Sequence, residues 1–192
     1  DRDGNDLDIM YANGPTTTIQ PAIVGEYKNI AEEAQVELAS GSLADGSSLK
    51  WLNDGLLSTY MYGDPAFYDT YVRETEIENT ATFELTFDTA RTVRAIMVYN
   101  SKNTENIFLN ISRVEFVCEE DGKEVTRFIE DLAFPEEFYQ KADIGNEILY
   151  VTPGAAAFSE FYELNVKSIK VTVEVPAGQS LVGISEIRVL GK

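Results

Sequence analysis

The sequence contains no histidine and a single cysteine, Cys118, among its 192 residues. The absence of histidine excludes Ser-His-Asp and Cys-His catalysis, and it excludes histidine-ligated zinc or iron. One cysteine cannot form an internal disulfide, and its position in an alternating apolar run predicts a small buried side chain. No apolar run approaches the roughly 20 residues that a membrane-spanning helix needs. Among enzyme classes, this leaves chemistry that depends on a pair of carboxylates.

Basic residues are also scarce. The chain has 15 Lys and Arg against 33 Asp and Glu, which gives a formal net charge of -18. The negative electrostatic field of such a protein repels phosphate backbones and anionic lipid headgroups, so nucleic acid and acidic membranes are poor partners. Neutral ligands and cations remain open. A high negative charge also serves solubility alone.

What the sequence does contain is a series of short strand patterns. In Thr82–Phe87 the side chains alternate, so that Phe83, Leu85 and Phe87 share one face. The pair Asp121-Gly122 predicts a hairpin turn. Further strands are predicted over Val93–Tyr99, Val114–Cys118, Lys123–Ile129, Ser168–Val175 and Ile184–Leu190, and short helices over 64–71 and 135–141. Many strands separated by turns predict an all-β sandwich.

The beginning of the chain lacks such periodicity. Residues 1–27 include glycines, prolines and three consecutive threonines, which predicts a leader or linker. Residues 28–192 are then expected to form one β-sandwich domain. Because the first residue is Asp1, we expect a mature chain or a piece of a longer one.

Four segments, taken in order, resemble the discoidin, or factor V/VIII type C, domains. Among these the chain is most similar to the family 32 carbohydrate-binding modules of bacterial glycan-degrading enzymes. The segments are Asn29–Ser40, Leu52–Thr59, Ala81–Asn100, and Val166–Val173 together with Gly183–Ile187. In two places the chain departs from the family pattern: Tyr60 and Met61 stand where a Trp is common, and the stretch 130–163 is longer than usual.

The resemblance implies a jelly-roll β-sandwich, galactose-binding-domain-like, with one or two short helices. It also implies a non-catalytic module that binds a neutral carbohydrate, is secreted or displayed on the cell surface, and anchors a larger glycan-active protein to its substrate. A structural calcium ion is implied at Asp54, Thr59 and Glu186, since calcium prefers carboxylate and carbonyl oxygens. The alternative is that Asp54-Gly55 is only a turn and Glu186 an exposed strand residue.

By matched position, the resemblance assigns ligand contacts to residues in the loops at one end of the sandwich. Sugar binding needs aromatic faces together with amide or charged groups for the hydroxyls. The implied residues are Trp51, Tyr60, Tyr62, Asn100, Asn103 and Gln179. The alternatives are core packing for Trp51 and ordinary turn positions for Asn100 and Asn103.

Three other functions remain open at this point, since a fold does not fix a function. A protein-binding or adhesion domain would present an apolar patch, which the aromatic residues within Glu130–Glu163 would supply. A structural spacer would have no ligand site. An enzyme would need a working pair of carboxylates.

Overall fold

The computed structural model describes residues 26–57, 69–73, 79–144, 146–151 and 154–192. Over these residues the chain consists of β-strands and single turns of 3-10 helix, which confirms the predicted all-β class. The strands are β1 (Lys28–Asn29), β2 (Gln35–Ser40), β3 (Ser42–Leu43), β4 (Thr70–Arg73), β5 (Thr80–Asn100), β6 (Ile111–Glu120), β7 (Lys123–Leu132), β8 (Tyr139–Ile144), β9 (Asn146–Val151), β10 (Ala156–Glu174) and β11 (Val182–Gly191). The 3-10 turns are η2 (Ala31–Glu33), η3 (Leu49–Trp51), η4 (Thr104–Asn106) and η5 (Glu136–Phe138).

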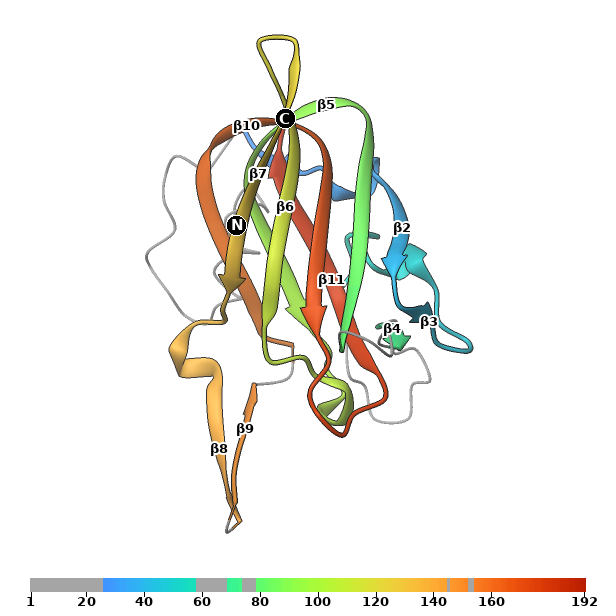
Figure 1. Ribbon diagram of the computed structural model, residues 1–192, viewed down its shortest axis with the longest axis vertical. Coiled ribbons are helices and arrows are strands. Elements are labelled where there is room, and N and C mark those ends of the chain that lie inside the picture. The colour runs from blue at the N-terminus through green and yellow to red at the C-terminus, as the bar shows by residue number, and fades with distance from the viewer. Residues whose placement is uncertain (1–25, 58–68, 74–78, 145, 152–153) are drawn as a thin grey trace.

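The two longest strands, β5 and β10, run through both layers of a sandwich. The first half of β5 pairs with β2 and with the second half of β10, which continues to β6 and β7. The second half of β5 pairs with β11 and with the first half of β10. Register shifts at 160–164 and 166–168 mark where β10 changes layer, as bulges bend a strand. Figure 1 shows these strands running along the length of the domain.

The core between the layers follows the predicted alternation. Ala81, Phe83, Leu85 and Phe87 of β5 are at most 1% exposed, and their neighbours point outward. Cys118 is fully buried, as predicted. In β11 every residue is buried: the core covers one face, and on the other face Leu190 packs in a smaller apolar cluster while Glu186 and Arg188 contact the loop at Gly55. That second cluster consists of Tyr27, Ala95, Met97, Tyr99, Ala156 and Leu190.

The hairpin predicted at Asp121-Gly122 joins β6 to β7. Both residues have positive φ angles, of 51° and 73°, which a tight two-residue hairpin turn requires. An exposed aspartate followed by glycine can adopt this conformation at small cost, because glycine has no Cβ. The turn lies at the upper end of the domain in Figure 1.

Three local predictions differ from the structure. The strands predicted over 82–87 and 93–99 are parts of the single strand β5, because the intervening residues continue it around a bend. The helix predicted over 64–71 is contradicted at its end, where Thr70 and Tyr71 belong to β4 and pair with β11. Residues 64–68 lie outside the described part of the chain. Of the short helix expected over 135–141, only residues 136–138 are helical, as the 3-10 turn η5; residues 139–141 belong to β8, so the prediction is wrong there.

The boundary predicted between a leader and the domain at residues 27 and 28 can be followed on one side only. Tyr27 is 7% exposed and packs in the second apolar cluster, so the packed domain includes this residue. The remainder of the expected leader, residues 1–25, lies outside the described residues. None of the helices in the described part of the chain is long and apolar enough to cross a membrane.

A pair of phenylalanines tests the assignment of the core. Phe83 is fully buried, whereas Phe128 on β7 is 54% exposed and lies under the Arg113 guanidinium at 4.3 Å. We expect Phe83→Ala to lower the free energy of unfolding by about 3–5 kcal/mol. Phe128→Ala should cost no more than about 1 kcal/mol, the value of an exposed cation–π contact. Urea denaturation of both variants measures this, and equal losses would contradict the assigned layers.

Candidate functional site

Two loops meet at one end of the sandwich, the lower end in Figure 1. One loop, 101–110, connects β5 to β6, and a second, 175–181, connects β10 to β11. Gln179 joins them, since its side-chain amide donates to the carbonyls of Ile107 at 2.9 Å and Leu181 at 3.1 Å. The backbone hairpin of β8 and β9 extends beyond the sandwich at the same end. The predicted residue Gln179 therefore lies half-buried between the two loops.

Asn103 lies on the same loop end and shapes the first of these loops. Its side-chain oxygen accepts a hydrogen bond from the Glu105 amide at 3.1 Å, which caps η4. The backbone amide of Asn103 donates to the Ser101 hydroxyl at 3.0 Å. The side chain is half-exposed and also forms a hydrogen bond with the Tyr71 side chain, which fixes the turn further.

Asn100 has a structural role in place of the predicted ligand contact. It is fully buried, and its NH₂ group donates to the Phe108 carbonyl at 2.8 Å. Its side-chain oxygen accepts from the amides of Ser101 at 2.9 Å and Phe108 at 3.1 Å. Because the amide is buried and engaged on both sides, it holds the 101–110 loop together and does not present itself to a ligand.

A buried carboxylate below this loop was not among the predicted residues. Asp69, fully buried, accepts hydrogen bonds from the Ser101 hydroxyl at 2.6 Å and the Lys102 amide at 3.2 Å. The Tyr71 hydroxyl lies 3.4 Å from the same carboxylate. Burial, and next the Asp69 charge, raise the pKa of Tyr71 above its ordinary value. The carboxylate thus ties the start of β4 to the loop that follows β5.

Close packing at this point requires a glycine in β11. A Cβ on Gly183 would come within 2.7 Å of the Tyr71 ring and 2.9 Å of the Ser101 hydroxyl, both closer than side chains tolerate. The loop end is therefore preorganised by buried contacts and does not depend on exposed side chains alone. Lys102, also on this loop, is half-exposed, and burial lowers the pKa of its ammonium.

Trp51 ends the turn η3, beside the same group of segments. The Ser48 side chain caps this turn by accepting from the Lys50 amide at 3.3 Å, and the Ser48 carbonyl accepts from the Thr70 hydroxyl at 3.0 Å. The indole is half-buried, which is compatible both with packing and with one face turned to a ligand. The other predicted aromatic contacts, Tyr60 and Tyr62, lie outside the described residues, as does Thr59.

The Asp54-Gly55 loop lies against β11, as the resemblance implies. The Gly55 amide donates to one oxygen of Glu186 at 3.0 Å, and the Ile187 amide donates to the Leu52 carbonyl at 2.6 Å. Asp54 accepts from the Leu56 amide at 2.9 Å, the pattern of an Asx turn. The alternative that Glu186 is an exposed strand residue is wrong, because Glu186 is fully buried.

The Glu186 carboxylate has one buried oxygen that could serve as a metal ligand. Its second oxygen, Oε2, is buried and has no hydrogen-bond partner among the described residues. Burial raises the pKa of Glu186 to about 9; Arg188 opposes this shift, and the charges of Asp54 and Glu32 add to it. The described part of the chain contains no group of three or more metal-ligating side chains. The oxygens of Glu186 and Asp54 fit a hard cation whose remaining ligands are other loop oxygens.

Comparisons with known proteins place the fold. No protein-family model matches the chain, and no curated protein matches it. Among solved structures, it is similar to the family 32 carbohydrate-binding module of NanJ from Clostridium perfringens in complex with galactose, with a TM-score of 0.52 and 15% identity. The match covers 85% of this chain and 98% of that module.

Two further modules from Clostridium perfringens give the same result. One is CBM32-5 of CpGH89 in complex with GalNAc-β-1,3-galactose, with a TM-score of 0.52 and 14% identity over 84% of this chain and 99% of the other. The other is CBM32-1 of a family 31 glycoside hydrolase, with a TM-score of 0.52 and 16% identity over 86% and 99%. The chain therefore has the discoidin-like β-sandwich fold of these modules, which confirms the predicted resemblance at the level of fold.

Glu186 predicts a specific dependence of stability on pH in metal-free protein. The folded chain holds a proton up to about pH 9, which the unfolded chain releases near the ordinary value of 4.5. The free energy of unfolding should therefore be greatest below the unfolded pKa and fall as pH rises toward 9, by at most about 1.4 kcal/mol per pH unit. In a chelating buffer, Glu186→Gln should remove this fall, whereas Glu37→Gln, at an exposed position of β2, should keep it. Urea unfolding at a series of pH values measures the slope, and an unchanged slope in the Glu186 variant would contradict the assignment.

Proposed function

We propose that this chain is a non-catalytic carbohydrate-binding module that holds a larger secreted, glycan-active protein on its substrate. The observation that carries the proposal is the set of polar groups collected at the loop end. Asn103, Lys102 and Gln179 lie on two loops that the Gln179 amide joins directly. Asp69 fixes the first of these loops from below. Such a collection of amide and ammonium groups suits the hydroxyls of a sugar.

The fold supports the same proposal. The modules of similar fold match over nearly their whole length, and two of them are in complexes with galactose or GalNAc-β-1,3-galactose. We place the sugar of this chain at the loop end, with Trp51, Tyr60 and Tyr62 as the aromatic faces. Asn100 supports the loop from inside.

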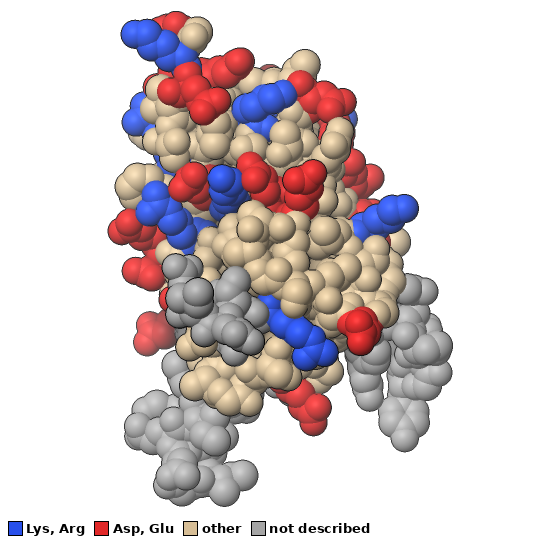
Figure 2. Space-filling model, turned by 45° about the vertical axis from the view of Figure 1, so that its right-hand side comes forward, with Lys and Arg blue, Asp and Glu red and all other residues tan. Residues whose placement is uncertain are grey.

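The distribution of charge favours a neutral ligand at this end. On the face shown in Figure 2, the Asp, Glu, Lys and Arg side chains that are coloured are most numerous in the upper part, and the described surface of the lower part is mainly tan. The two figures share the same vertical axis, so the loop end lies in the lower part of Figure 2 as well. A net charge of -18 also disfavours acidic ligands at long range.

We further propose a structural calcium ion between the Asp54-Gly55 loop and β11. Glu186, through its unpartnered Oε2, and Asp54 would hold it, with Thr59 as the third side-chain ligand. When bound, calcium would offset the negative charge of these oxygens and link the loop to the last strand. The Glu186 carboxylate must release its proton to bind the ion.

The alternative of a protein-binding domain receives less support from the side chains that would form its patch. Within the stretch 130–163, Phe134 is 4% exposed, and Phe138 and Phe158 pack against buried clusters. Tyr162 is an exception, at 90% exposed. Among the described side chains of this stretch, which do not include those of 139–151, a single exposed tyrosine does not make the contiguous apolar patch that a docking surface needs. We therefore treat a protein partner, like a spacer role, as an outcome of the test below.

Sugar binding at the loop end can be tested by thermal shift with galactose, N-acetylgalactosamine and fucose as probes. A ligand that binds the folded state alone must raise the melting temperature. We expect a rise with at least one sugar in the wild-type chain, and a smaller rise in Gln179→Ala and Asn103→Ala. Thr126→Ala, an exposed position on β7, is the matched control and should respond as the wild type does. No response to any sugar, together with an empty glycan array, would point instead to a protein partner or a spacer.

The calcium site predicts a second thermal shift. Adding calcium to chelator-treated protein should raise the melting temperature. At a calcium concentration a hundredfold above the dissociation constant, the free energy of unfolding should increase by about 2.7 kcal/mol. Glu186→Gln should abolish this response, because an amide cannot supply a charged oxygen, while Glu37→Gln should retain it. Calorimetry without calcium binding by the wild-type chain would overturn the site.

A further inference from the structure

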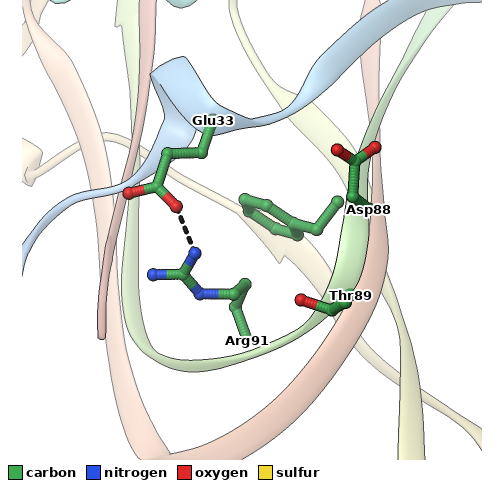
Figure 3. A pocket seen from close by; sticks show the side chains of 5 residues that line it. Glu33, Asp88, Thr89 and Arg91 are labelled. Carbon is green, nitrogen blue, oxygen red and sulfur yellow. Dashed lines mark hydrogen bonds and ion pairs between the residues drawn. The ribbon is translucent and has the colours of Figure 1, made fainter.

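A small cavity lies at the end of the sandwich opposite the loops. It has a volume of about 250 Å³ and is lined by Glu33, Phe87, Asp88, Thr89 and Arg91. Glu33 ends η2, and the other four residues belong to the bend where β5 passes from one layer to the other. Figure 3 shows the side chains of Glu33 and Arg91 pointing toward each other on one side, with Asp88 and Thr89 on the other.

The walls of this cavity are fixed by groups from three other elements. The Lys167 ammonium of β10 donates to the carbonyls of Phe87 at 2.7 Å and Asp88, which clamps the bend of β5. Gln35 of β2 approaches the Asp88 carboxylate at 3.4 Å. The Glu33 carboxylate is held by two cations, Arg91 and, at 3.1 Å, Lys28 of β1. The cavity is thus preorganised, which lowers the entropy that a ligand would have to lose.

The charges around the cavity are nearly balanced. Glu33 faces two cations, and both members of the Glu33–Arg91 pair remain partly accessible, with 36% and 27% of their side chains exposed. A free anion would meet the Glu33 and Asp88 carboxylates, and a free cation would meet Arg91, so neither finds an unopposed partner. Uncharged hydroxyls fit better, because a carboxylate accepts several hydrogen bonds and a guanidinium has five N–H donors.

We propose that this cavity is a second binding site, for a single neutral sugar ring, independent of the proposed site at the loop end. Its polar groups are of the kind that recognise vicinal hydroxyls: two carboxylates, a guanidinium and the Thr89 hydroxyl. Its volume is below the about 300–1,000 Å³ of pockets for drug-sized ligands, which suits one ring and not a longer oligosaccharide. Phe87 is 1% exposed, so the contact is made by the polar rim and not by stacking on its face.

Two sites at opposite ends would make the domain bivalent. The loop end and the bend of β5 are separated by the full length of the strands, so one ring cannot reach both. Two separate glycan chains, or two branches of one, could then be held at once, and the apparent affinity for a dense glycan surface would exceed that of either site.

The test is a titration of the full chain with galactose, N-acetylgalactosamine, glucose and fucose, followed by ¹H–¹⁵N NMR. We expect saturable shifts at the amides of Glu33 and 88–91 with at least one of the sugars, with a dissociation constant on the order of 1 mM. The double variant Asp88→Ala/Thr89→Ala removes two rim side chains at exposed positions and should weaken these shifts at least about tenfold. Gln179→Ala, the matched control at the loop end, should leave them unchanged.

The outcomes separate this inference from the proposed function. Saturable shifts confined to the 101–110 and 175–181 loops would overturn the second site and leave the loop site standing. Saturable shifts confined to the bend of β5 would support the second site and contradict the loop site. Shifts at the bend that do not saturate, or that persist unchanged in the double variant while its melting temperature matches the wild type, would overturn the second site.

Discussion

Two long strands that belong to both layers of the sandwich determine where every candidate site lies. Because β5 and β10 turn together near residues 88–93 and 160–168, their ends return to the same side of the molecule. This brings the loop after β5, the loop after β10 and the start of β4 together at one end. The same bend opens a cavity at the other end. The pairing of these two strands is therefore the constraint on which both the core and the sites depend.

Their pairing also explains the unusual burial of β11. This strand pairs with β5 along most of its length. One of its faces packs in the main apolar core, and on the other face Glu186 is covered by the Asp54-Gly55 loop. A carboxylate placed in such a strand loses its water on all sides, which is why the pKa of Glu186 rises. A group of this kind is costly for a fold that needs only packing. A retained proton would offset the cost by itself. A bound cation would also offset it, but would need oxygens of Asp54 and of the loop as further ligands.

Much of the fold could be predicted because the relevant information is local. The alternation of Phe83, Leu85 and Phe87 identifies a strand with one buried face, and Asp121-Gly122 identifies its own turn. The site could be predicted less well. Asn100 looked like a loop residue at the end of a strand, yet its amide is buried, because the loop folds back through Phe108. Asp69 gave no signal, since its partners Ser101 and Lys102 are more than 30 positions away in the chain. The cavity at the bend of β5 needs Glu33 and Arg91 from distant segments, and no motif marks such a meeting.

Physical differences between the two ends suggest how a single fold can support two kinds of contact. At the loop end, the proposed recognition would depend on loops that buried groups hold in place, so a ligand site there could vary while Asp69, Asn100 and Gly183 keep the frame. At the opposite end, most of the polar rim belongs to the bend of β5, which Lys167 of β10 holds, so an insertion or deletion in its backbone would disturb the pairing of β5 with β10. Rigid strands hold side chains more closely than loops do, at the cost of variability. A site at the bend would therefore be small and fixed in its choice of ligand, and a site on the loops would be broader and more readily altered.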